Sequence, residues 1–163
     1  MFRGSVQGAA DHNNHYIVST TIIEKESLSM GLDMYVWEVK KKDLNGPVGE
    51  LKEDTHYDEF RYWRKHPNLH GWMEQLYRQK GGKDIFNCVY VELTKKNLEA
   101  LYKDLLSGDL PETTGFFFGK DEKGLDTYAI RTLADDLKFV ADALDWYADP
   151  ENEDSALVYY SWW

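Results

Sequence analysis

The sequence predicts a single α+β domain, in which about three helices pack on a small, mostly antiparallel sheet. Segments rich in β-branched and aromatic residues alternate with amphipathic segments of helical period, an order typical of this class. The chain has 163 residues, and roughly 100–200 residues make one domain. Hydrophobic residues make up 42% of the chain and aromatic residues 15%, which is enough for a core of its own.

Several segments have the composition of strands. Each is rich in β-branched or aromatic residues, and most are bounded by charged residues, glycine or proline. Cys88 falls inside one of them, where we expect it to behave as a small apolar side chain. The expected strands are 33–39, 59–64, 85–93, a short one at 116–118, and 156–163.

Three segments have the start and stop signals of helices. Proline at a first helical position, threonine as an N-cap and glycine after the last turn are such signals. We expect Leu106 on the apolar face of the second helix and Leu133 on that of the third. The expected helices run from Pro67 to the Gly81-Gly82 pair, from the cap Thr94 to Gly108, and from the cap Thr132 to Ala148.

Residues 1–29 differ in composition from the rest of the chain. They lack the charged and then apolar order of a secretory signal. Residues 16–23 are β-branched enough to add an edge strand to the sheet. We favour the alternative that 1–29 are translated upstream sequence and that the native chain starts at Met30, because Lys25-Glu26 can be encoded by a ribosome-binding sequence. On either interpretation, residues 30–163 are expected to form the single α+β domain.

The charge balance argues against several classes of function. The chain has 19 Lys and Arg against 29 Asp and Glu, a formal net charge of −10. Direct DNA or RNA binding, or attachment to an anionic membrane, needs a surplus of basic residues, so neither is expected. No apolar run approaches the roughly 18 residues of a membrane-spanning helix. Cys88 is the single cysteine, which excludes an intrachain disulfide and a cysteine-based zinc site and suits a reducing cytoplasm.

No motif of a standard catalytic site is present. The sequence lacks the Gly-x-Ser-x-Gly elbow of hydrolases and the glycine-rich phosphate loops. His66, His70 and Glu74 have a spacing that suits a metal face on a helix, but His66 precedes Pro67, and such a position avoids helical dihedral angles. We therefore expect no metal and no cofactor, and we favour a protein that is not an enzyme. A small hydrolase or phosphodiesterase that uses His66 or His70 as acid or base stays the alternative.

Segment 61–72 gathers aromatic and basic residues at the start of a helix in an otherwise acidic chain. A helix N-terminus attracts anions, and an indole ring can stack on a planar group. The alternative is that the tryptophans belong to the core and that the basic side chains pair with acidic ones.

Two further segments are rich in aromatic residues: the three consecutive phenylalanines at 116–118 and the aromatic ending 159–163. Their rings cannot all point to one face of a strand, so some of them are buried on a second face or exposed for a ligand or partner. The candidate ligand-binding residues are Trp63, Arg64, Lys65, His70 and Trp72, with Thr113, Thr114 and Phe117 opposite them.

Five short motifs follow one another along residues 30–163. They are Met30-Gly31-Leu32-Asp33-Met34-Tyr35, Tyr62-Trp63-Arg64-Lys65, His70-Gly71-Trp72, Thr113-Thr114-Gly115-Phe116-Phe117-Phe118-Gly119 and Tyr159-Tyr160-Ser161-Trp162-Trp163. With these motifs the chain resembles a family of small uncharacterised proteins encoded by bacteriophages and by prophage-like regions of bacterial genomes. The resemblance implies an accessory gene product of bacteriophage type and no established reaction.

We therefore expect an accessory protein that acts by binding, in the cytoplasm of the bacterial host, and that counters a host defence. Its target would be a nucleotide-like signalling molecule, held by the aromatic and basic residues, or a host protein. An acidic surface that mimics DNA is a further alternative, weakened by the lack of a long run of one charge sign. Exposed aromatic residues and edge strands also favour a homodimer.

Overall fold

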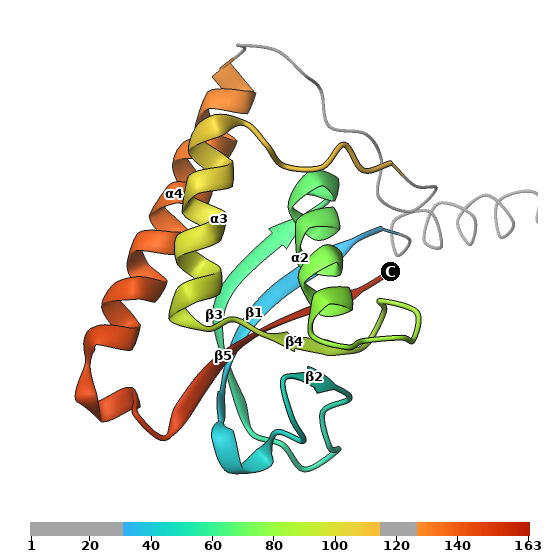
Figure 1. The fold of residues 1–163 in the computed structure, drawn as a ribbon, viewed down its shortest axis with the longest axis vertical. Coiled ribbons are helices and arrows are strands. Elements are labelled where there is room, and N and C mark those ends of the chain that lie inside the picture. The colour runs from blue at the N-terminus through green and yellow to red at the C-terminus, as the bar shows by residue number, and fades with distance from the viewer. Residues whose placement is uncertain (1–30, 115–126) are drawn as a thin grey trace, which may run out of the picture. The chain divides into compact units, whose positions relative to one another are not determined.

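The structure is a computed structural model that describes residues 31–114 and 127–163, without the side chains of 127–131. Residues Gly31–Trp163 form one compact unit. Within the described part, three α-helices accompany a five-stranded antiparallel sheet, which confirms the predicted α+β class (Figure 1). In chain order the elements are β1 (Asp33–Lys40), η1 (Lys41–Asp43), β2 (Val48–Gly49), β3 (Tyr57–Arg64), α2 (Pro67–Gln79), β4 (Tyr90–Glu92), α3 (Lys95–Ser107), α4 (Thr127–Ala148), η2 (Pro150–Asn152) and β5 (Ser155–Trp162).

The sheet has the strand order β2-β4-β5-β1-β3, so the first and last strands of the unit lie side by side at its middle. Tyr35 of β1 is paired with Tyr62 of β3 on one side and with Tyr160 of β5 on the other. A register shift between Val36 and Trp37 marks a bulge in the β1–β3 ladder. Three tyrosines on neighbouring strands thus lie in one row across the sheet.

The helix ends of α2 and α3 follow the predicted signals. Pro67 is in the first turn of α2. Thr94 caps α3, because its hydroxyl oxygen accepts from the Asn97 N–H while the Asn97 side chain accepts from the Thr94 N–H. Gly108 ends α3 with a φ of 73°, a left-handed conformation that glycine adopts without strain. The prediction for the third helix was wrong at its start, since α4 begins at Thr127 rather than after Thr132.

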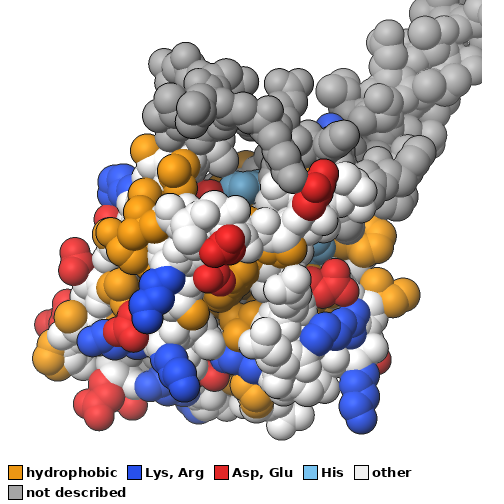
Figure 2. Space-filling model, turned by 45° about the horizontal axis from the view of Figure 1, so that its top comes forward, with side chains coloured by type: hydrophobic (Ala, Val, Ile, Leu, Met, Phe, Trp, Pro, Cys, Tyr) orange, Lys and Arg blue, Asp and Glu red, His pale blue; other side chains and the backbone are white. Residues whose placement is uncertain are grey.

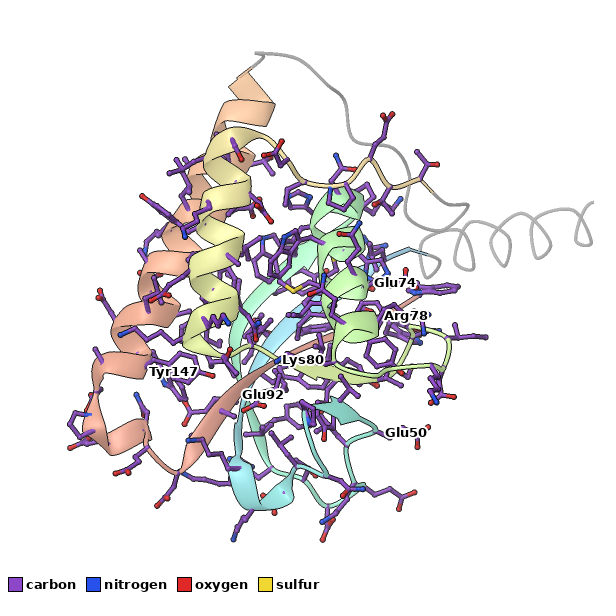
Figure 3. All side chains as sticks on the ribbon, viewed as in Figure 1. Glu50, Glu74, Arg78, Lys80, Glu92 and Tyr147 are labelled. Carbon is purple, nitrogen blue, oxygen red and sulfur yellow. The ribbon has the colours of Figure 1, made fainter. Side chains whose placement is uncertain are left out.

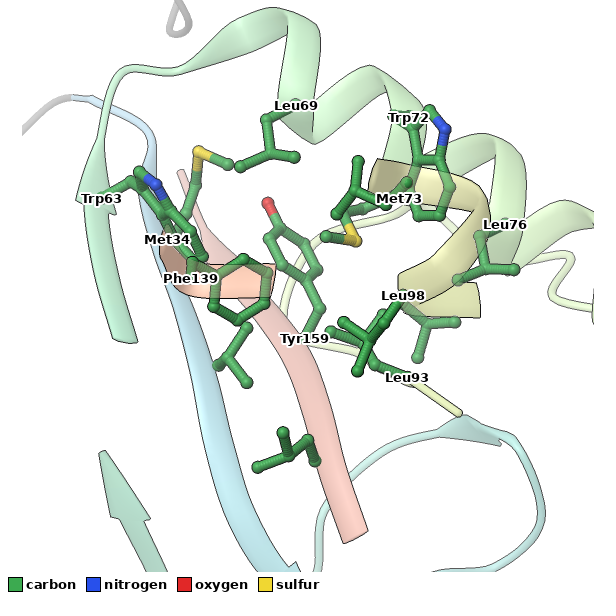
Figure 4. Close-up of a cluster of buried hydrophobic side chains, with 14 of the residues drawn as sticks. Met34, Trp63, Leu69, Trp72, Met73, Leu76, Leu93, Leu98, Phe139 and Tyr159 are labelled. Carbon is green, nitrogen blue, oxygen red and sulfur yellow. The ribbon is translucent and has the colours of Figure 1, made fainter. Parts of the chain in front are cut away.

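One face of the sheet is covered by the helices. The core between them contains apolar side chains from β1, β5 and all three helices, and Tyr159 of β5 lies in its middle (Figure 4). Successive side chains of a strand alternate between the faces, so Met34 and Val36 of β1 enter this core while Tyr35 and Trp37 lie on the opposite face. The labelled core residues in the close-up are Met34, Trp63, Leu69, Trp72, Met73, Leu76, Leu93, Leu98, Phe139 and Tyr159.

Polar side chains attach the helices to the sheet at one end of the core (Figure 3). At the end of α2, the Lys80 ammonium donates to the Glu92 carbonyl of β4 at 2.5 Å, and burial lowers its pKa. On α4, the Tyr147 hydroxyl donates to the Leu93 carbonyl at 2.6 Å and accepts from the Leu157 N–H, and burial raises its pKa to about 12. These bonds satisfy backbone groups where β4 and β5 leave the ladder.

The predicted strand 85–93 is wrong over its first half, because only Tyr90–Glu92 is strand. Residue Cys88 has a φ of 57° and an exposed side chain, so it is not the buried apolar residue that was expected. The side chain of Asn87 explains the change: it donates to the Trp163 carbonyl at 2.9 Å and accepts from the Trp163 N–H at 3.1 Å. It therefore makes, from one side chain, the pair of bonds that a strand residue would make from its backbone.

Two leucines predicted on helix faces are exposed. Leu106 is 60% exposed, because Leu98, Leu101 and Leu105 take the core positions of α3 and the next residue lies about 100° further round the helix. Leu133 is 39% exposed. The predicted strand at 116–118 lies outside the described residues.

Candidate functional site

The Trp63 side chain is part of a buried polar cluster. Its indole Nε1–H donates to Asp136 Oδ1 of α4 at 3.0 Å, and His66 Nε2 lies 2.6 Å from Asp136 Oδ2. All three side chains are buried, and the Trp63 ring packs edge-on against Phe139. The cluster therefore ties β3, the start of α2 and α4 together.

Trp72 makes the equivalent link on the other side of α2. Its Nε1–H donates to Asp104 Oδ2 of α3 at 2.7 Å, and its ring is 8% exposed. Both predicted tryptophans are thus core side chains, and the indole N–H of Trp63 joins β3 to α4 while that of Trp72 joins α2 to α3. Of the two interpretations that the sequence leaves open for these rings, burial in the core is the one the structure shows.

His70 lies on the buried side of α2. Its Nδ1 lies 2.8 Å from the Tyr159 hydroxyl and its ring stacks on Phe86. Burial lowers the pKa of His70 to about 4 and raises that of Tyr159 well above its ordinary value. His70 is therefore neutral at pH 7, and at 1% exposure it has almost no surface to offer a ligand.

Arg64 is one of the exposed members of the predicted set. Its Nη1 donates to both carboxylate oxygens of Asp33, at 3.0 and 3.3 Å, and the Tyr62 hydroxyl donates to Asp33 Oδ1 at 2.6 Å. The hydrogen bond with Tyr62 and the Asp33 charge raise the pKa of Arg64, while burial and the bond to Asp33 raise that of Tyr62. Lys65 follows, exposed, with a φ of 55° and its N–H bonded to the Leu32 carbonyl at 2.8 Å.

Thr113 lies against α2. Its N–H donates to Asn68 Oδ1 at 2.9 Å, and a Cβ at Gly71 would lie 1.9 Å from its hydroxyl oxygen. Gly71 is thus the residue that lets this segment approach the helix. Thr114 is exposed, and Phe117 lies outside the described residues.

The face of the sheet opposite the helices carries a second group of aromatic rings, which we call the aromatic face. Trp37 is stacked between two tyrosines, Tyr57 and Tyr160, with ring centroids 4.2 and 4.3 Å away. Tyr35 continues the row, 5.4 Å from Trp37 and 5.1 Å from Tyr62. The aromatic face comprises Tyr35, Trp37, Tyr57, Tyr62, Tyr160 and Trp162, from strands β1, β3 and β5.

Much of this face is open to solvent. Trp162 is 51% exposed, Tyr57 49% and Tyr62 40%. Leu44 and Leu51 pack on the adjoining part of the same sheet face, around Val39, Tyr90 and Val158. The Asp33–Arg64 pair belongs to the same strands and borders the open part. An array of aromatic rings with one arginine at its border has the composition of a binding surface.

Three tyrosines of this face, Tyr35, Tyr62 and Tyr160, have raised pKa values and stay protonated well above neutral pH. Burial raises the pKa of Tyr160, to which the neighbouring Cys88 also contributes, and burial and the Asp33 charge raise that of Tyr35. Their hydroxyls can therefore donate hydrogen bonds to a partner. These side chains are therefore suited to contact a partner and to donate hydrogen bonds to it, and not to transfer protons at neutral pH.

Two shallow cavities lined by described residues lie away from this face. One, of about 200 Å³, is between α2 and α3 and includes Trp72 and Asp104. The other, of about 280 Å³, is formed by Lys41, Tyr147 and the turn at 148–153. In the described ranges, no group of three or more His, Cys, Asp and Glu side chains could hold a metal ion. None of the helices there is long and apolar enough to cross a membrane.

Comparison with protein-family models, with curated proteins and with solved structures found no match to this chain.

The aromatic face was missed as a site by sequence reasoning, although the alternation of the aromatic ending 159–163 raised the question of a second covered or exposed face. A signal was present in β1, where Met34 and Val36 alternate with Tyr35 and Trp37. Both faces of this strand are apolar, yet the helices cover one of them.

Proposed function

We propose that the protein is an accessory protein of bacteriophage type that acts by binding a host protein and so counters a host defence. The aromatic face is the proposed binding surface. One observation carries this choice: six aromatic side chains gather on the face of the sheet opposite the described helices, and three of them are 40–51% exposed. Large exposed apolar areas of this kind typically mark interaction sites.

A protein partner fits this surface better than a nucleotide-like molecule. Tyrosine, tryptophan and arginine are the residues enriched in the energetic centres of protein interfaces, and the aromatic face with Arg64 supplies all three. The indoles of Trp63 and Trp72, which a stacked base would need, are buried and bonded to Asp136 and Asp104. Neither of the two cavities described above lies on the aromatic face.

The charge distribution and the histidines give the other interpretations less support. Figure 2 shows Lys and Arg interspersed with Asp and Glu over the face it presents, rather than the one-sign field that a DNA mimic needs. For a hydrolase, His66 and His70 would have to reach a substrate, but both are buried and bonded to Asp136 and Tyr159. Binding a host protein without catalysis needs neither a surface of one charge sign nor an accessible histidine.

The test is capture of bacterial host proteins by the immobilised full chain, with variants that remove single exposed apolar side chains. Trp162→Ser and Tyr57→Ser alter the aromatic face, and Ile85→Ser is the matched control, because Ile85 is 73% exposed on a loop outside this face. We expect one host protein to be retained stoichiometrically by the wild type and by Ile85→Ser. Its affinity for Trp162→Ser should fall by about 2 kcal/mol, or roughly 30-fold, as for a central interface tryptophan.

The same variants separate the alternatives. Equal capture by Trp162→Ser and the wild type would overturn the aromatic face as the binding surface. Calorimetric titration of the wild type with cyclic and linear nucleotides gives the second readout. Saturable nucleotide binding without any retained host protein would move the function to a small-molecule target.

A further inference from the structure

We infer that the aromatic face takes a cationic partner: the segment of the host protein that binds there carries arginine or lysine side chains, which contact its exposed rings and pair with Glu50 and Glu59. This inference rests on the proposed function and names the chemistry of the partner. Exposed aromatic rings alone would suit any apolar segment. The choice of a basic segment comes from the charged side chains that the sheet places beside the rings.

Glu59 of β3 is an exposed carboxylate on the aromatic face. It pairs with Trp37 in the β1–β3 register, and its charge is one of those that, after burial, raise the pKa of Tyr35. Phe60, the extra residue of the bulge, packs against Phe139 in the core, which leaves Glu59 on the opposite side of the strand. The negative charge of Glu59 therefore lies next to the stacked rings.

Glu50 supplies a second exposed carboxylate, from the other edge of the sheet. It follows β2, whose Gly49 pairs with Tyr90, and Tyr90 pairs in turn with Tyr160. Burial and Cys88 raise the pKa of Tyr160, and the Glu50 charge adds to this effect. The stacked rings therefore have an exposed carboxylate at each side.

These two carboxylates are not matched by a basic side chain of the described part of the chain, where the salt bridges are formed by other residues. Arg64, the basic side chain at the border of the face, donates to both oxygens of Asp33. Among these four charged side chains the carboxylates are in excess. The field at the aromatic face is therefore expected to attract cations and to repel anions.

A basic side chain gains two kinds of contact at such a surface. The face of a tryptophan or tyrosine ring attracts an ammonium or guanidinium group, and an exposed carboxylate pairs with it. Arginine suits both contacts, because its planar guanidinium stacks on rings and forks onto carboxylates. Trp162 and Tyr57 are about half exposed and are the rings that such a side chain reaches most easily. An acidic segment would instead meet Glu50 and Glu59 with like charge.

Calorimetric titration of the full chain with synthetic peptides tests this chemistry. The probes are a peptide in which arginine alternates with serine and the same peptide with glutamate in place of arginine. We expect saturable binding of the arginine peptide, weakened by added salt, and no detectable binding of the glutamate peptide. Equal affinities for the two peptides, or no binding of the arginine peptide, would overturn the inference.

Variants of the chain locate the binding, because a protein of net charge −10 attracts basic peptides at many points. The double variant Glu50→Gln with Glu59→Gln should bind the arginine peptide about fivefold more weakly, as expected for the loss of two exposed ion pairs. The matched control, Glu99→Gln with Glu151→Gln, removes the same charge from exposed positions of α3 and η2 and should bind like the wild type. Circular dichroism melts verify folding, and equal weakening in the two double variants would overturn the inference.

The failure of this inference can be told apart from the failure of the proposed function. Suppose that the affinity for a retained host protein falls in Trp162→Ser but is unchanged in the Glu50→Gln and Glu59→Gln double variant and insensitive to salt. The cationic partner would then be overturned while the aromatic face remained the binding surface. Binding of the arginine peptide that this double variant weakens, with no host protein retained, would support the cationic site and overturn the host-protein target.

Discussion

The two faces of the sheet use the same residue types in opposite ways. On the helix-covered face, Trp63, Trp72 and Tyr159 are buried, and the polar tip of each is bonded to a side chain of another element. On the aromatic face, Trp37 is stacked between Tyr57 and Tyr160 of the neighbouring strands, and Tyr57 is 49% exposed. An aromatic residue in this chain therefore supports the fold or forms the surface according to the side of the strand it occupies.

The largest expected effect on the covered face is that of Asp136→Ala. It removes the acceptor of the Trp63 indole and the carboxylate that contacts His66, both in a buried setting. A buried polar group that loses its partner costs about 1–3 kcal/mol, so the variant should lose about 3 kcal/mol of unfolding free energy in urea denaturation. Asp142→Ala is the control, because its exposed ion pair with Lys138 on the same helix is worth less than about 0.5 kcal/mol. Equal losses in the two variants would contradict the account of the buried cluster.

A comparable effect is expected from pH, through His70. Its pKa is about 4 in the folded protein and 6.5 when unfolded, so between these values the unfolded state binds more protons and stability falls as the pH falls. This contribution is complete above pH 6.5, and its loss by about pH 4 amounts to about 3 kcal/mol. Urea denaturation at several pH values should therefore show a steeper acid decline in the wild type than in His70→Gln. The exposed His56→Gln should follow the wild type, and a His70→Gln curve parallel to the wild type would count against burial of a neutral His70.

A smaller effect is expected where Thr113 meets α2. A Cβ at Gly71 would clash with the Thr113 side chain, so Gly71→Ala should cost about 1–3 kcal/mol even though alanine is the better helix former. In the double variant Gly71→Ala with Thr113→Ala, the cost should be largely recovered. Thermal melts of the three proteins measure this, and a Gly71→Ala variant as stable as the wild type would show that the segment does not lie against the helix.

The smallest effect on stability is expected on the aromatic face. Trp162→Ser removes a half-exposed ring from the last residue of β5 and should change the unfolding free energy by less than about 0.5 kcal/mol. Urea denaturation at pH 7 gives the comparison with Asp136→Ala. A loss as large as that of Asp136→Ala would mean that the aromatic face also holds the fold together.

Local signals in the sequence were enough to predict most elements but not the roles of their aromatic residues. The proline, threonine and glycine at the ends of α2 and α3 act within a few residues, which is why those boundaries could be predicted. The acceptors of Trp63 and Trp72 lie 73 and 32 positions further along the chain, so no local pattern could decide between core and ligand site. The aromatic face depends on the pairing of β1 with both β3 and β5, which the sequence leaves open. Cys88 was misplaced because a side chain, Asn87, replaces the backbone pairing of a strand.

Hydroxyl-radical footprinting of the complex with the captured host protein tests the central claim most directly. Tyr57 of the aromatic face and Tyr102 of α3 are a matched pair, 49% and 40% exposed, so both should be oxidised in the unbound protein. Our account predicts that the partner protects Tyr57 and leaves Tyr102 as reactive as before. Protection of Tyr102 with no change at Tyr57 would place the binding surface on the helices and contradict the division between the two faces.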